Sequence, residues 1–160
     1  MKIYLMQHGK AFSEDQDKQR RLTPEGEMDI QIAADVIKEL EIRFDLILTS
    51  TKTRAFQTAE IIAKSIGYDT KRITSTDLLN PTAPPEKIIP FLKGLQAETV
   101  LIVGHLPCLA GLFKELTGGE IRFEMGALCC IEAEEPLKER GILLWYILPK
   151  HLRIIKVGLK

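Results

Sequence analysis

The sequence has no excess of charge of either sign, and this absence excludes a broad set of partners. Lysine and arginine together number 22, and so do aspartate and glutamate. A protein that attracts nucleic acid or an anionic membrane through its electrostatic field needs an excess of positive charge. We therefore expect neither partner. The basic end at 150–160 is interpreted as a solvated tail, and electrostatic docking is the alternative interpretation.

Cysteine is scarce, and long apolar runs are missing. Cys108, Cys129 and Cys130 are an odd number, so one stays unpaired, and the two adjacent residues would face opposite sides of a strand. No apolar run has the length that a bilayer requires, and the first residues enter a strand directly, without the features of a secretion signal. We expect a soluble, unprocessed, cytoplasmic protein with reduced thiols.

No internal repeat, linker or low-complexity segment divides the chain. Its 160 residues are enough for one domain with a proper core and too few for two domains of ordinary size. We therefore expect residues 1–160 to form a single domain.

Apolar runs of strand length alternate with helical patterns along the sequence. The strands expected are 3–6, 45–49, a short one at 72–75, 99–103, and a hairpin of 127–133 and 142–148. Strands that alternate with helices indicate a mostly parallel sheet covered on both faces, to which the hairpin adds an antiparallel edge. The fold class expected is α/β, a three-layer α/β/α sandwich.

Helix boundaries are marked by several residues. Thr23 and Pro24 combine a capping hydroxyl with a proline at the first helical position. Gly67 ends the next helix, and Pro90 should shorten or kink a helix expected at 85–95. The apolar face expected for the first helix is Met28, Ile32, Ala33, Val36, Ile37 and Leu40. The face expected for the second, which Ser50 and Thr51 would cap, is Ala55, Ala59, Ile62, Ala63 and Ile66.

Two of the expected strands end at a histidine next to a glycine. The first reads Gln7-His8-Gly9, and the other reads Gly104-His105. Ligands of open α/β sheets lie at the carboxyl ends of the strands, and Gly9 would let another group approach the backbone closely. We therefore expect the two imidazoles to converge at one edge of the sheet.

Two arginines fall near the same edge. Arg20 lies in the polar loop at 12–21, and Arg54 lies in the first turn of a helix, beside the positive end of its dipole. Arg21 competes with Arg20, which we favour for its distance from the helix start. Two histidines and two arginines repel one another unless an anion lies among them, and guanidinium groups match phosphate oxygens. The cluster predicts a phosphoryl site.

The chemistry that this cluster predicts is nucleophilic attack by histidine. A neutral imidazole can attack phosphorus and form a phosphohistidine that water later cleaves, and neighbouring cations favour the neutral form by lowering its pKa. No metal or other cofactor is needed. Zinc at His8 and His105 is the rival interpretation, but His151 and the cysteines lack the spacing of zinc ligands. Cysteine-based phosphatase chemistry is excluded, because no arginine follows a cysteine at the required spacing.

Four motifs together resemble the histidine phosphatase superfamily, which is related to the phosphoglycerate mutases. They are Gln7-His8-Gly9, Arg20-Arg21-Leu22-Thr23-Pro24-Glu25-Gly26, Ser50-x-x-x-Arg54-Ala55-x-Gln57-Thr58-Ala59 and Gly104-His105-Leu106-Pro107. They occur in order over nearly the whole chain. The small size and the Gly-His-Leu-Pro ending are similar to the SixA-type phosphohistidine phosphatase branch.

The resemblance implies a phosphoglycerate mutase-like fold and a metal-independent phosphatase. It implies that His8 accepts the phosphate, that Arg20 and Arg54 bind it, and that His105 completes the pocket. It also implies a role in signal transduction, with a phosphorylated histidine-containing phosphotransfer protein or a small phosphorylated molecule as the substrate. The oligomeric state is left open.

One departure from the family pattern is Gln7, where the family has an arginine. Gln7 donates a hydrogen bond but carries no charge, and by analogy with a lost oxyanion donor we expect a rate lower by about 10² to 10³. Lys10 could restore the charge from the far side of Gly9, as a point charge in place of a planar fork. The further candidates for phosphate binding are therefore Gln7, Gly9, Lys10 and Ser50.

The leaving group favours phosphohistidine over an alkyl phosphate. An alkoxide leaves poorly without a positioned acid, whereas the imidazole of phosphohistidine can carry its own proton. The matched motifs contain no such acid; Glu14, Asp15 and Asp17 are the acids that could reach the site from the first loop. Two alternatives stay open. One is a small-molecule phosphomonoesterase or mutase, and the other is a phosphate- or protein-binding module in which Gln7 has abolished turnover.

Overall fold

A mixed six-stranded sheet forms the centre of the computed structural model, which describes residues 1–135 and 137–158. The strand order is β3-β2-β4-β1-β5-β6. The parallel strands are β1 (Lys2–Gln7), β2 (Leu46–Ser50), β3 (Thr74–Thr76) and β4 (Thr99–Gly104). The hairpin of β5 (Leu128–Glu132) and β6 (Ile142–Ile147) lies antiparallel at one edge. The predicted sheet is confirmed.

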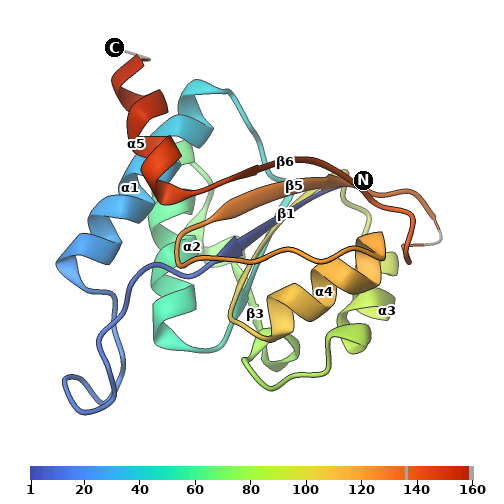
Figure 1. Ribbon diagram of the computed structural model, residues 1–160, viewed down its shortest axis with the longest axis horizontal. Coiled ribbons are helices and arrows are strands. Elements are labelled where there is room, and N and C mark those ends of the chain that lie inside the picture. The colour runs from blue at the N-terminus through green and yellow to red at the C-terminus, as the bar shows by residue number, and fades with distance from the viewer. Residues whose placement is uncertain (136, 159–160) are drawn as a thin grey trace.

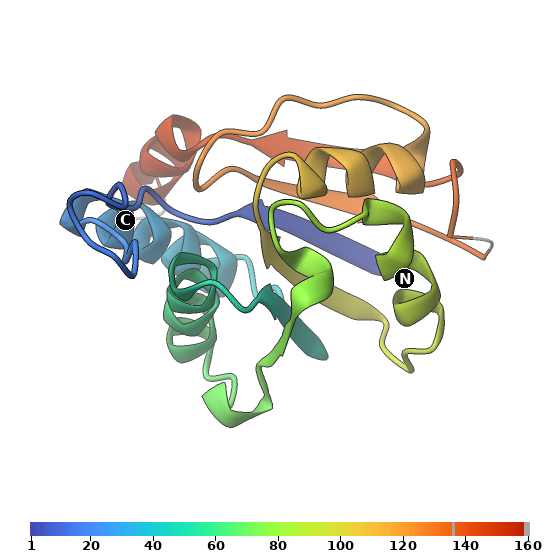
Figure 2. The ribbon, with the colours of Figure 1, turned by 90° about the horizontal axis from the view of Figure 1, so that it is seen from below.

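Helices cover both faces of the sheet (Figure 1). On one face lie α1 (Pro24–Glu39), α2 (Thr53–Ile66) and α5 (Pro149–Gly158), and on the other lie α3 (Ile88–Lys93) and α4 (Cys108–Thr117). The view from below shows the same separation (Figure 2). Ile3 and Leu5 of β1 pack with α3 and α4, whereas Tyr4 and Met6 pack with α1 and α2. Because strand side chains alternate between faces, β1 contributes to both cores, and the three-layer α/β/α architecture is confirmed.

Most of the predicted helix boundaries are confirmed. The Thr23 hydroxyl accepts a hydrogen bond from the Gly26 N–H at 3.0 Å, and Pro24 is the first residue of α1. Gly67 ends α2 in the left-handed region, with φ of 73°. The helix that contains Pro90 is short, since only Ile88–Lys93 is α-helical after a 3₁₀ turn. Local signals of capping and helix breaking therefore decide where these elements begin and end.

Two predictions about helices are wrong, the first only in part. Of the face expected for α1, Ala33, Val36 and Ile37 are buried, but Met28 and the C-cap Leu40 are 66% and 55% exposed. The expected cap of α2 at Ser50 and Thr51 is also wrong: α2 begins at Thr53, Lys52 is its N-cap, and no side chain caps it. The apolar face expected for α1 is therefore confirmed in part, and the cap expected for α2 is not.

The basic end of the chain is not the solvated tail that the sequence suggested. Residues 149–158 form α5, which packs along α1 and buries Leu152. Arg153 and Lys156 bond to Asp29 and Asp35 of α1 at 2.5 and 2.8 Å. Residues 159–160 lie outside the described residues. Two cations of this segment, Arg153 and Lys156, are therefore partners of α1, and a docked helix over 149–158 replaces the expected tail.

The three cysteines are free and buried, as expected. Cys129 and Cys130 face the two different cores, one on each side of β5. Burial raises the pKa of the Cys108 thiol to about 11 and that of Cys129 to about 12. Of the helices among the described residues, none combines the length and the apolar character that crossing a membrane requires.

Candidate active site

His8 and His105 follow neighbouring parallel strands. Gln7 of β1 lies opposite Gly104 of β4 in the sheet, so both histidines leave the sheet at the same edge. Their ring centroids are 4.8 Å apart, and their exposed fractions are 6% and 2%. The parallel pairing of β1 with β4 therefore brings together two imidazoles from distant parts of the sequence.

The hydrogen bonds of His8 define its tautomer. Nδ1 lies 2.7 Å from the carbonyl oxygen of Gly9, and because a carbonyl only accepts, Nδ1 carries the proton and donates it. Nε2 is then unprotonated in the neutral ring, and it accepts a hydrogen bond from Nε of Arg54 at 3.2 Å. The nitrogen that is able to attack an electrophile is thus the one that faces the guanidinium group.

The pKa of His8 is lowered to about 4. Burial is the largest cause, the hydrogen bond to Gly9 opposes it, and the charges of Arg54 and Arg20 lower the pKa further. The sequence argument named only the neighbouring cations. The structure shows that removal from water matters more, and His8 is neutral at neutral pH.

His105 is also held neutral. Its pKa is lowered to about 3, first by burial and then by electrostatic interaction with His8, Arg54, Lys52 and Arg20. Its Nε2 lies 2.8 Å from Oγ of Ser50, and its buried Nδ1 has no hydrogen-bond partner among residues 1–135 and 137–158. A buried polar atom without a partner is costly, so Nδ1 is a candidate for contact with a ligand.

Arg54 carries a buried charge without an acidic partner. The residue is 8% exposed, and within the described residues its guanidinium makes one hydrogen bond, to His8. Burial and the charge of Arg20 lower its pKa. An uncompensated buried cation is unfavourable unless an anion comes to it. The site is therefore suited to bind an anion.

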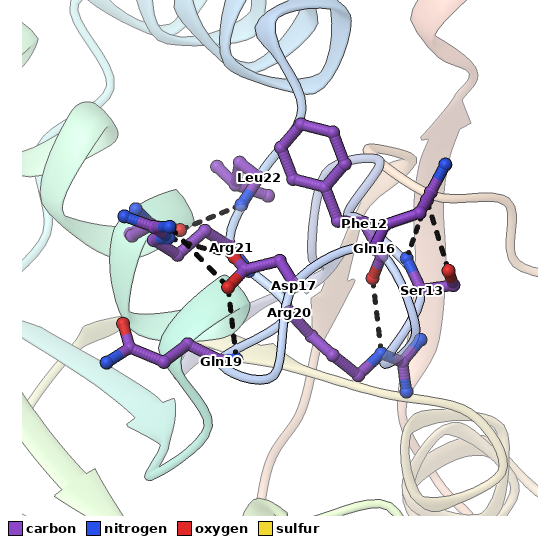
Figure 3. Close-up of polar contacts among 9 residues, drawn as sticks. Phe12, Ser13, Gln16, Asp17, Gln19, Arg20, Arg21 and Leu22 are labelled. Atoms are coloured by element: carbon purple, nitrogen blue, oxygen red, sulfur yellow. Dashed lines mark hydrogen bonds and ion pairs between the residues drawn. The ribbon is translucent and has the colours of Figure 1, made fainter.

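Arg20 and Arg21 leave the first loop in opposite directions (Figure 3). Arg21 bonds to Asp17 at 2.9 Å and is exposed. Arg20 has a left-handed backbone, with φ of 50°, and its Nε donates to the Phe12 carbonyl at 3.3 Å. Its charge lowers the pKa of His8, as described above. Of the two arginines, Arg20 is thus the one whose charge reaches the histidines, whereas Arg21 is exposed and paired with Asp17.

Two residues that the sequence argument left without a role hold the loops of the site. Thr58 Oγ1 accepts a hydrogen bond from the Gly9 N–H at 3.1 Å, and Gln57 Oε1 accepts one from the Leu22 N–H at 2.9 Å. Both residues lie on α2. Their presence in the quoted motif with Arg54 was the signal that could have revealed this anchoring role.

Close backbone packing occurs beside His8, as expected for Gly9. A Cβ at Gly9 would lie 2.7 Å from Cγ1 of Ile30, and a Cβ at Gly26 would lie 2.1 Å from the carbonyl oxygen of Lys10. Neither contact is possible for a larger residue without movement. The two glycines let the start of α1 press directly against the His8 loop.

Gln7 and Lys10 lie beside this cluster rather than within its hydrogen bonds. Gln7 is 8% exposed, and its Oε1 has no hydrogen-bond partner. Lys10 Nζ bonds to Glu25 at 2.6 Å, and this contact lowers the pKa of the Glu25 carboxyl. Both residues line a cavity of about 520 Å³, whose other lining residues include Phe123, Met125, Lys150 and Arg153. Their roles in phosphate binding stay predictions.

The predicted acids of the first loop do not reach the histidines. Asp17 is bonded to Arg21, which lowers the pKa of its carboxyl to about 2, and Glu14 and Asp15 are exposed. In the described part of the chain, no three His, Cys, Asp or Glu side chains gather where they could hold a metal ion. The groups that do gather are His8, Gly9, Arg20, Ser50, Arg54 and His105.

Known proteins resemble this chain in sequence. Residues 3–80 match the histidine phosphatase superfamily (branch 1). The phosphohistidine phosphatase SixA of Escherichia coli (strain K12) is 26% identical over 162 residues, which cover 98% of this chain and 99% of that protein. An uncharacterised protein of Picosynechococcus sp. is 41% identical over 132 residues, 75% of each chain.

A solved structure extends the likeness to the fold. The structure of the protein histidine phosphatase SixA complexed with tungstate has a TM-score of 0.87 and 25% identity, and the match covers 95% of this chain and 99% of that one. The likeness in sequence and in structure thus runs over nearly the whole chain. The chain is therefore a phosphatase of the histidine phosphatase superfamily.

Proposed function

We propose that the protein hydrolyses phosphohistidine through a phosphorylated His8 intermediate. The observation that carries this proposal is the state of His8: its proton is held on Nδ1 by the Gly9 carbonyl, and its unprotonated Nε2 faces Arg54. The similarity to SixA, which is a phosphohistidine phosphatase, supports the same substrate class. The proposal makes His8 the nucleophile and needs no metal.

The reaction divides into two transfers of the phosphoryl group. In the first, Nε2 of His8 forms a bond to phosphorus while the bond between phosphorus and the substrate nitrogen breaks. The substrate imidazole leaves with the proton that its other nitrogen carries. In the second, water attacks phosphorus, the bond to Nε2 breaks, and both protons of the water leave with the released phosphate as dihydrogen phosphate. Nδ1 of His8 donates to Gly9 throughout.

The cations around His8 bind the phosphate. Arg54 is already hydrogen-bonded to Nε2, so a phosphoryl group that approaches this atom meets the guanidinium. Arg20 adds a second charge, and the Gly9 backbone, Ser50 and His105 complete the pocket. Gln7 and Lys10 contribute from the neighbouring cavity. Because the charge of the transition state spreads over the phosphoryl oxygens, fixed cations stabilise it strongly.

The absence of a nearby carboxylate supports the choice of a nitrogen leaving group. Among the described residues, no carboxylate is hydrogen-bonded to His8, Arg54 or His105. An alkyl phosphate needs a proton donor for its leaving oxygen, whereas phosphohistidine does not. We therefore propose a histidine-containing phosphotransfer protein of a cytoplasmic signalling system as the partner, with small phosphate esters as poorer substrates.

The test is trapping of the intermediate. After brief exposure to ³²P-labelled phosphoramidate, the parent should carry an acid-labile label that His8→Ala loses. His151→Ala is the matched control, because His151 is exposed and lies outside the site. A phosphohistidine peptide should be cleaved faster than an alkyl phosphate. Absence of both label and turnover with every donor would overturn the proposal and favour the binding module suggested by Gln7.

A further inference from the structure

A chain of side-chain hydrogen bonds runs from His105 to the 3₁₀ turn Asp77–Leu79. Oγ of Ser50 lies 2.8 Å from Nε2 of His105 and 2.6 Å from Oδ1 of Asn80. Nδ2 of Asn80 donates to Oδ1 of Asp77 at 2.7 Å, and the Thr51 hydroxyl donates to the same oxygen at 2.7 Å. No motif in the sequence pointed to Asn80 or Asp77.

The direction of each hydrogen bond follows from the carboxylate at the end of this chain. A carboxylate only accepts, so the NH₂ group of Asn80 faces Asp77, and the carbonyl oxygen of Asn80 faces Ser50. The Ser50 hydroxyl has one proton, which it donates to Asn80. Its lone pairs are left for the backbone N–H of Lys52, at 3.1 Å, and for an N–H at Nε2 of His105.

The Nδ1 atom of His105 is consequently unprotonated while the ring is neutral. It is buried and has no partner, and the charged groups that reach the ring from other elements are cationic: Arg54, Lys52 and Arg20. Burial and these cations disfavour protonation of Nδ1 when no ligand is bound. A bound dianion reverses the field, because an opposite charge favours the protonated imidazole.

We propose that Asn80, oriented by Asp77, is a positioning residue that fixes the proton of His105 on Nε2, and that Nδ1 of His105 takes up a proton from solvent when an oxyanion binds. The second half rests on the proposed function, which makes this cluster the phosphoryl site. The imidazolium that forms donates an N–H to an oxyanion oxygen and adds one positive charge to the pocket.

The first experiment observes the tautomer in the ligand-free protein. Long-range ¹H–¹⁵N spectra of the histidine side chains distinguish a protonated from an unprotonated ring nitrogen, and His151→Ala leaves two rings to assign. We expect the parent to show His105 with the proton on Nε2. In Asn80→Leu the Ser50 hydroxyl is free to donate to Nε2, so the proton should move to Nδ1. A proton on Nδ1 in the parent would overturn the inference.

The second experiment counts protons during ligand binding. Tungstate carries no proton near neutral pH, so calorimetric titrations in buffers of different ionisation enthalpy report proton uptake by the protein. We expect about one proton per tungstate bound to the parent and close to none for Asn80→Leu, whose Nδ1–H is already in place. The paired exchange Asp77→Asn with Asn80→Asp keeps an acceptor for Ser50 and should restore the uptake.

A matched control separates positioning from general damage to the loop. Thr51→Val removes a hydroxyl that lies 2.7 Å from Oδ1 of Asp77 and 3.1 Å from Oδ1 of Asn80, but it leaves the link from Asn80 through Ser50 to His105 intact. It should therefore bind tungstate with the same proton uptake as the parent. Equal uptake in the parent and Asn80→Leu would overturn the role of Asn80. If the parent failed to bind tungstate, both the proposed proton uptake and the proposed function would be overturned. The tautomer of His105 in the ligand-free protein would still decide the role of Asn80.

Discussion

The two histidine junctions of this protein look alike in sequence but are held in different ways. At the end of β1, His8 is oriented by the backbone carbonyl of the next residue, Gly9. At the end of β4, His105 is oriented by Ser50, and behind it by Asn80. A hydrogen bond to a backbone carbonyl survives most substitutions nearby. A series of side-chain hydrogen bonds is broken by substitution of any residue in it. His8, the proposed nucleophile, therefore has the support that is less sensitive to substitution, and His105 has the support that is more sensitive.

The largest expected effect is the loss of the proposed nucleophile, His8, at the first junction. His8→Ala should lower the turnover of phosphohistidine by about 10⁴ or more, because no other described group replaces Nε2. His105→Ala should lower it by about 10² to 10³, the cost of one group that stabilises charge. Initial rates with a phosphohistidine peptide measure both. Equal losses would show that the two junctions share the chemical step.

Restoring the missing charge beside the first junction should have the next largest effect. Gln7→Arg is expected to raise the rate by about 10² to 10³, because a guanidinium adds positive charge beside the phosphoryl group. Gln7→Met is the matched control: Oε1 of Gln7 has no partner, so its loss should change little. An unchanged rate in Gln7→Arg would mean that this side chain does not reach the bound phosphate.

An added methyl group should destabilise the fold more at the first junction than at the second. Gly26→Ala places a Cβ 2.1 Å from the Lys10 carbonyl, and we expect it to lower the free energy of unfolding by about 3 kcal/mol. Gly104→Ala, whose Cβ would lie 3.2 Å from Leu109, should cost about 1 kcal/mol. Gly94→Ala has room for a Cβ and serves as the control. Denaturant unfolding measures all three, and equal costs would contradict the close packing at the His8 loop.

The lowered histidine pKa values predict a stability that depends on pH. Below about pH 6.5 the unfolded chain binds protons at both histidines, while the folded protein does so only near the pKa values of about 4 for His8 and about 3 for His105. Stability should therefore fall as the pH falls from 6.5 towards 4, by up to about 3 kcal/mol per unit. His105→Asn should halve this slope. A flat profile above pH 5 would contradict the burial of neutral rings.

The smallest expected effect compares the two neighbouring arginines of the first loop. Arg20→Ala should weaken tungstate binding about tenfold, because it removes a charge that reaches both histidines. Arg21→Ala should weaken it less than about twofold, since Arg21 is exposed and bonded to Asp17. Titration calorimetry measures the affinities. The opposite order would assign phosphate binding to Arg21.

Much of the fold could be predicted because its signals are local. The apolar runs of β1 and β4, the cap at Thr23 and the stop at Gly67 each depend on a few adjacent residues. The convergence of His8 with His105 followed from the parallel pairing of neighbouring strands. The face of α1 was predicted only in part: Ala33 and Ile37 are buried but Met28 is exposed, because the neighbouring elements decide which apolar residues of a helix are covered.

The sequence by itself determined the kind of fold, the two strand ends that carry histidines, and the family. Only the tertiary structure decided which arginine of the first loop turns inward, that α5 docks on α1, and that Asn80 stands behind His105. The physical reason is the range of the interactions. Periodicity and capping act between residues close in sequence, whereas tautomers, buried charges and docked helices depend on side chains that meet only once the chain has folded.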